Sequence, residues 1–118
     1  MKHYVKTENS DKKGFIHFFS EISLEDLSNQ VHNCFISNGY KLKDGTSGNG
    51  IYEKGSRIAR LLLGAFYKYF KWKILTERDG LEILVKVERK SSGMSGGLIG
   101  MNQVKKETKN LFNKLMAL

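Results

Sequence analysis

The sequence predicts an α+β fold: an antiparallel sheet of four to six strands, with two helices at about 24–38 and 101–117 packed on one face. Short runs of alternating apolar and polar residues, separated by turn-forming residues, are typical of β-hairpins. Two longer segments repeat apolar residues at helical spacing. The chain has no proline, so its turns depend on 12 glycines. Its 118 residues are enough for one domain with its own core.

The first 20 residues predict an N-terminal arm followed by a strand. Residues 1–13 carry few apolar side chains and are expected to form a loose arm or a marginal edge strand, which leaves residues 14–118 as the single α+β domain. GFIHFFS, at 14–20, is an apolar and aromatic run of strand length.

A helix is expected next, at about 24–38. Ser23 is a plausible N-cap, Glu25 and Asp26 lie in the first turn, and Gly39 is placed to end the helix. One stripe of this helix is apolar and should face the core: Leu24, Leu27, Val31, Cys34 and Phe35.

After Gly39 the apolar period changes to two, which predicts two hairpins. In the first, YKLK at 40–43 and IYEK at 51–54 flank a loop of turn-forming residues. In the second, AFYKYFKWKILTE at 65–77 and LEILVKVER at 81–89 are joined by a turn at 78–80. The inward residues of the second hairpin are expected to be Phe66, Phe70, Trp72 and Ile74 on one strand, and Leu81, Ile83, Val85 and Val87 on the other.

Residues 55–66 fit either a strand or a short helix, and the sequence favours a strand with a bulge at Gly64. The chain then ends in a helix from about Met101 whose apolar stripe should complete the core. That stripe comprises Val104, Thr108, Leu111, Phe112 and Leu115.

This order of elements, namely strand, helix, two hairpins and helix, extends over residues 14–118. It resembles the TBP-like and helix-grip families, and small bacterial domains of the same plan. In those families helices pack on one face of a curved antiparallel sheet. Such folds host DNA binding, apolar-ligand binding and other roles, so the resemblance implies no functional residue here.

Charge is the compositional feature that points to a partner. The formal net charge is +8, and most of the 20 basic residues lie after residue 40. A basic surface attracts anions at long range and is compatible with an anionic partner, either nucleic acid or a phosphate-bearing ligand. The alternative interpretation is solubility on a lysine-rich surface, and the net charge alone does not decide between the two. Cys34 is the single cysteine and no apolar run is long enough to span a bilayer, which is typical of a cytoplasmic protein.

Motifs for catalysis or metal binding are missing from the sequence. His3, His17 and His32 are scattered, and neither H-x-x-x-H nor C-x-x-C spacing occurs. Cys34 lies on the apolar stripe of its helix, where an inert core thiol is expected, and His17 is expected to be a satisfied sheet histidine. The sequence therefore predicts a non-enzymatic binding or interaction domain without metal or cofactor.

SSGMSGGLIG, at 91–100, is the one glycine-rich loop that precedes a helix. It lacks the lysine of a phosphate-binding P-loop and the strand context of a dinucleotide fingerprint. We interpret it as a conformational device that turns the chain into the last helix. The alternative is an anion site at the helix start, formed by Ser95, Gly96, Gly97, Lys105 and Lys106.

A second binding hypothesis uses the face of the sheet. Tyr67, Tyr69, Lys71 and Lys73 alternate on one side of a strand, where an exposed face could stack bases and contact phosphates of single-stranded nucleic acid. The alternative interpretation is a solvated sheet back. A peripheral membrane contact through residues 57–63 would need an exposed amphipathic helix and is not expected.

Overall fold

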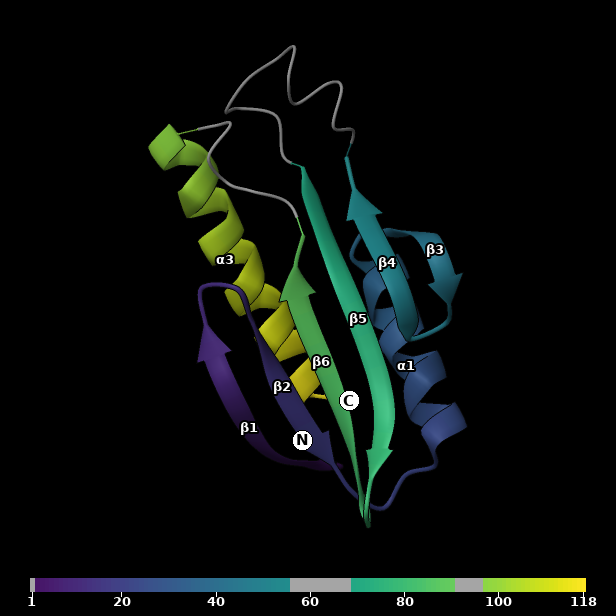
Figure 1. Cartoon of the computed structure of the whole chain (residues 1–118). Helices are drawn as coiled ribbons and strands as arrows, with labels where there is room; N and C mark the ends of the chain where they lie inside the picture. The colour runs from purple at the N-terminus through teal and green to yellow at the C-terminus, as the bar shows by residue number, and fades with distance from the viewer. Residues whose placement is uncertain (1, 56–68, 91–96) are drawn as a thin grey trace.

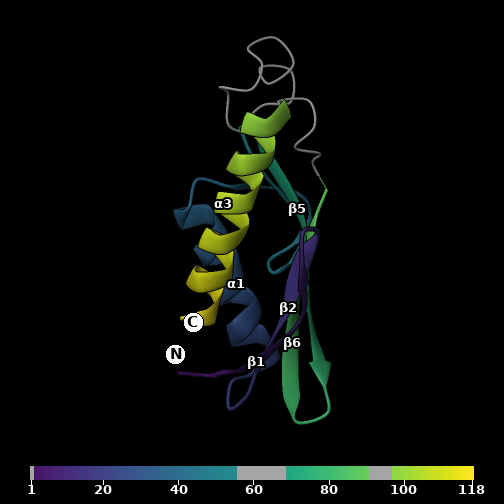
Figure 2. The ribbon, with the colours of Figure 1, turned by 90° about the vertical axis from the view of Figure 1, so that its left-hand side faces the viewer.

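The chain forms one antiparallel sheet covered on one face by two helices (Figures 1 and 2). The structure is a computed structural model that describes residues 2–55, 69–90 and 97–118. The strand order is β1-β2-β6-β5-β4-β3, which confirms the α+β class and the predicted antiparallel sheet. The elements are β1 (Tyr4–Asp11), β2 (Gly14–Phe19), α1 (Leu24–Ser37), β3 (Lys41–Thr46), β4 (Asn49–Lys54), β5 (Phe70–Asp79), β6 (Glu82–Arg89) and α3 (Gly97–Met116).

Helix α1 begins and ends where the sequence predicts. The Ser23 hydroxyl accepts a hydrogen bond from the backbone N–H of Asp26 at 3.0 Å, which satisfies one free donor of the first turn. Asn38 is the C-cap, and Gly39 follows it with a φ of +89° that a residue with a side chain rarely adopts. The expected stripe is buried from Leu27 to Phe35.

The β5–β6 hairpin is confirmed, but its predicted turn at 78–80 was wrong: the observed turn begins two residues later and ends one residue later. Arg78 still pairs with Ile83, and Asp79 with Glu82. The turn therefore consists of Gly80 and Leu81, and Leu81 lies at the tip with 95% of its surface exposed instead of facing the core. A two-residue turn is the commonest connection in a hairpin.

The N-terminal segment is the edge strand β1 rather than a loose arm. It pairs antiparallel with β2 from Tyr4↔Phe19 to Asp11↔Gly14. Gly14, at the start of β2, has a φ of +153°, and a Cβ there would meet the carbonyl oxygen of Val87 at 1.8 Å. Only glycine allows this close approach, which brings the β1–β2 turn beside the end of β6.

The core lies between the sheet and the helices. Phe70, Trp72 and Ile74 of β5 are buried, as are Ile83, Val85 and Val87 of β6. Figure 2 shows α1 and α3 on the same side of the sheet. Helix α3 begins at Gly97, four residues before the predicted start, and contributes Val104, Leu111 and Leu115 to the same hydrophobic cluster. The predicted shared core is thus confirmed, with Phe112 half-buried at its edge.

Two expected features lie outside the described residues. One is most of segment 55–66, for which a strand was favoured. The other is the first part of the glycine-rich loop, including Ser95 and Gly96. Gly97 is described as the first residue of α3.

Candidate functional site

A cleft of about 640 Å³ lies beside α3, between this helix, the β1–β2 turn and the end of β6, elements that can be followed in Figure 1. Its size is in the range of small-molecule sites. Its apolar part comes from Val104 and Phe112 of α3. The polar and charged residues around it are Ser10, Asp11, Lys12, Arg89, Asn102, Lys105, Thr108 and Lys109.

Four cations lie around this cleft: Lys12, Arg89, Lys105 and Lys109. None of them forms an ion pair with any residue that the structure describes. All 12 aspartates and glutamates of the sequence fall within the described ranges, so no carboxylate side chain of this chain forms an ion pair with these cations, and Asp11 is the one carboxylate that lines the cleft with them. The cleft therefore carries an excess positive charge that an external anion could balance.

The one carboxylate at the cleft has a local structural role. Asp11 Oδ1 accepts hydrogen bonds from the backbone N–H groups of Lys13, at 2.7 Å, and Gly14, at 3.2 Å. This closes the β1–β2 turn in the way that aspartate commonly does. This turn places Lys12 at the edge of the cleft.

Arg89 reaches the cleft because it continues the inward side of β6. Side chains alternate along a strand, so Arg89 shares its face with Val85 and Val87, which are buried under the helices. The inward residues expected from the sequence ended at Val87. Extending the two-residue period by one step would have placed Arg89 on the helix side.

A second cavity, of about 490 Å³, lies on the other flank of α3. Its lining includes a buried carboxylate, Glu107, together with Lys54 and Lys106, and also Phe70, Asn102, Gln103 and Asn110. Lys54 Nζ lies 3.8 Å from Glu107 Oε2, so part of the positive charge is already balanced. This cavity is a weaker candidate for an anion than the first.

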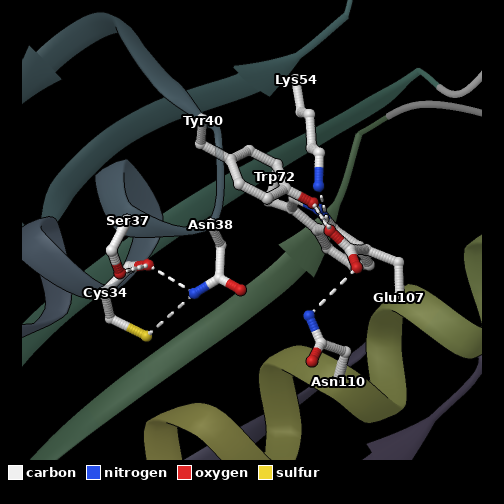
Figure 3. A network of polar contacts seen from close by, with 8 residues as sticks. All are labelled: Cys34, Ser37, Asn38, Tyr40, Lys54, Trp72, Glu107 and Asn110. Atoms are coloured by element: carbon white, nitrogen blue, oxygen red, sulfur yellow. Dashed lines mark hydrogen bonds and ion pairs between the residues drawn. The ribbon is translucent and has the colours of Figure 1, made fainter.

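Glu107 is also the centre of a polar network that joins the sheet to α3 (Figure 3). The indole N–H of Trp72 donates to the Tyr40 hydroxyl at 2.8 Å, and that hydroxyl donates to Glu107 Oε2 at 2.5 Å. Asn110 donates to the other carboxylate oxygen at 3.2 Å. Burial, followed by the adjacent Glu107 carboxylate, raises the pKa of Tyr40, which keeps the hydroxyl protonated as a donor. We assign this network a structural role.

His17 forms a second connection between sheet and helix. It is completely buried on β2, and its Nε2 lies 2.9 Å from the carbonyl oxygen of Phe112 on α3. A carbonyl can only accept, so Nε2 carries the hydrogen and Nδ1 accepts from the Thr7 hydroxyl at 2.7 Å. Tyr4 then donates to the Thr7 oxygen at 2.6 Å. Burial lowers the pKa of His17, although the hydrogen bond to Phe112 opposes the shift. These contacts agree with the predicted satisfied sheet histidine.

The structure separates the two lysines that the anion-site hypothesis grouped together. Lys105 lines the first cleft, whereas Lys106 lines the second cavity. Neighbouring residues of an α-helix point about 100° apart, which places the two lysines on opposite flanks of α3. Because α3 begins at Gly97, Lys105 also lies about 12 Å along the axis from the first residue, beyond the first turn.

The open face of the sheet has a different character. Tyr69 is 8% exposed, and its hydroxyl donates to Glu53 at 2.7 Å, so its ring is not open for stacking. Lys71 pairs in register with Glu53, and Lys73 with Glu88. Tyr67 lies outside the described residues. These contacts count against single-stranded nucleic acid on this face.

Cys34 has the environment of a structural thiol. It is buried on α1, and burial raises the pKa of its thiol, which disfavours the nucleophilic thiolate. Among the described residues, no three His, Cys, Asp or Glu side chains are grouped as metal ligands would be. Across the same ranges, no helix is long and apolar enough to cross a membrane.

No protein-family model matches the sequence, and neither a curated protein nor a solved structure matches the chain.

Proposed function

We propose that this protein is a small non-enzymatic binding module whose partner is anionic and binds in the cleft between α3, the β1–β2 turn and β6. The observation that carries the proposal is the set of four cleft cations that form no ion pair with any carboxylate side chain of the chain and that outnumber the single carboxylate of the cleft, Asp11. Charges on three separate elements converge there, so the positive charge depends on the tertiary fold. A convergent arrangement of this kind is typical of a binding site.

The chemistry around the cleft supports binding rather than catalysis. Arginine can contact a carboxylate or phosphate through two parallel hydrogen bonds, and lysines add charge with adaptable geometry. Ser10, near the end of β1, brings a hydroxyl to the cleft, yet no histidine lines this cleft to activate it as a nucleophile. The lining residues therefore provide recognition of negative charge without a nucleophile–base pair.

The test is a thermal-shift and calorimetric titration with three anions: inorganic phosphate, decanoate and a short single-stranded oligonucleotide. A ligand that binds only the folded state raises the melting temperature by mass action. We expect a saturable shift with at least one anion, abolished in Lys105→Ala/Lys109→Ala. The control Lys73→Ala/Lys86→Ala removes the same charge from the open face and should bind as wild type. Equal binding by both double variants, or no binding of any anion, would contradict the proposal.

A further inference from the structure

The floor of the cleft is apolar and held in place. The Phe112 ring packs edge-on against Phe15 at 5.1 Å and against His17 at 4.5 Å between ring centroids. Its backbone oxygen is fixed by the hydrogen bond from His17. Val104, about two helical turns before Phe112 on α3, is also buried and lines the cleft. The Phe112 ring is therefore held in a fixed position at the floor of the cleft.

The cations stand around this floor rather than along an extended path. Lys105 and Lys109 are one helical turn apart on α3, and Lys12 and Arg89 come from the sheet side of the cleft. Thr108 lies between the two lysines in sequence and is half-buried. Its hydroxyl donates to the Val104 carbonyl at 2.7 Å, so its methyl group is what remains to contact a ligand.

An apolar floor surrounded by cations favours one class of anion. A lone phosphate would use the cations but leave the apolar floor in contact with water. A nucleic acid strand carries one charge per nucleotide and favours a basic groove with several stacking platforms. A ligand with one anionic head and an apolar body matches both halves of the cleft, since burial of apolar surface is favourable.

We infer that the ligand is a free anionic amphiphile: a carboxylate or phosphate head held by the four cations, with an alkyl or aromatic body over Phe112 and Val104. This inference rests on the proposed function, because it names the class of anion that the same cleft takes. It concerns a monomeric ligand bound in the cleft and not a lipid surface, for which a cleft of about 640 Å³ would be unnecessary.

The experiment is a calorimetric series with octanoate, decanoate and dodecanoate below their micelle concentrations, alongside acetate, inorganic phosphate and decanol. We expect affinity to rise roughly two- to fourfold for each methylene that becomes buried. Acetate and phosphate should bind weakly because they lack the body, and decanol because it lacks the charge. An affinity that depends on both the anionic head and the apolar chain would support the inference.

Two variants test the location. Thr108→Trp should fill the cleft and remove the dependence on chain length, while the matched control Asn113→Trp places the same side chain on an exposed position of α3 outside the cleft. Lys105→Glu/Lys109→Glu should abolish binding of all three carboxylates. Circular dichroism and melting curves establish that each variant is folded before it is titrated.

The outcomes separate the two proposals. Binding of phosphate or of an oligonucleotide with no dependence on chain length would overturn the amphiphile and leave the anionic partner in place. Binding only to anionic phospholipid vesicles, with none to the free carboxylates, would also overturn it. If no anion of either titration binds, both proposals fail.

Discussion

On the open side of the sheet, lysines lie next to carboxylates. Lys43 contacts Glu53 at 3.3 Å, and Glu88 lies 3.0 Å from Lys90 and 4.0 Å from Lys86. On the helix-covered side, four cations surround a cleft and form no ion pair with a described residue, while the carboxylate of Glu107 is buried and hydrogen-bonded through both oxygens. Basic side chains are thus paired with carboxylates on the open side and left without ion pairs around the cleft.

The difference follows from how each side is built. Residues two apart along a strand lie on the same face, so Lys86 and Lys90 come close to Glu88, while Lys43 on β3 reaches Glu53 on the neighbouring β4. Around the cleft, the cations come from a turn, a strand end and a helix, and only packing of these elements brings them together. Exposed ion pairs such as those on the open face contribute little stability, whereas the unpaired cations around the cleft are available for a ligand.

The largest expected contrast in stability concerns the carboxylates. Glu107→Ala should lower the free energy of unfolding by about 1–3 kcal/mol, because the buried Tyr40 hydroxyl loses its acceptor. Glu88→Ala, on the open side, should cost about 0–1 kcal/mol, as exposed ion pairs do. Urea denaturation followed by circular dichroism measures both. Equal losses would show that the helix-side network contributes no more than a surface pair.

The next contrast is the dependence of stability on pH. The pKa of His17 lies below its ordinary value of 6.5 in the folded state, so the unfolded chain binds the extra proton first as the pH falls. Stability from His17 is therefore present above about pH 6.5 and decreases below it, by at most about 1.4 kcal/mol per pH unit.

His17→Gln keeps a donor for the Phe112 carbonyl and should flatten this dependence between pH 6.5 and 5.5, even if its stability at pH 7 is lower. Denaturation midpoints across this pH range measure the effect. An unchanged slope in His17→Gln would mean that other groups cause it.

A smaller effect is expected from the lysines. Lys105→Ala/Lys109→Ala should leave stability unchanged or raise it by a few tenths of a kcal/mol, because two unpaired like charges are removed. Lys86→Ala, which loses an ion pair with Glu88, should instead be neutral or slightly destabilising. Melting temperatures at low salt provide the comparison. A clear loss of stability in the double variant would indicate that the cleft lysines support the fold.

The smallest effect is expected at the hairpin tip, which belongs to neither side. Leu81→Asn should change stability by less than about 0.5 kcal/mol, because its side chain is exposed and packs on no core. Ile83→Val, two residues away and buried, should cost about 0.5–1.5 kcal/mol. If Leu81→Asn lowered the stability as much as Ile83→Val, the Leu81 side chain would have to make stabilising contacts, which contradicts its exposed position.

Periodicity determined most of the fold. The stripe from Leu27 to Phe35 and the alternation from Phe70 to Ile74 each identified an element and the side of it that is buried. Both patterns record local geometry, since the side-chain period of a helix or strand depends only on the backbone. Turn chemistry was less specific, because Arg78, Asp79 and Gly80 all fit a turn, and only strand pairing placed it at Gly80 and Leu81.

The sequence by itself determined the fold class, the two helices and the excess of positive charge. Tertiary structure decided where that charge acts. It placed Lys105 and Lys106 on opposite flanks of α3, and it brought Lys12 and Arg89 to the flank that carries Lys105. It also placed Glu107 under Tyr40, 67 residues away in the chain. Contacts at such separations depend on how elements pack, and the local periods of a sequence carry no information about them.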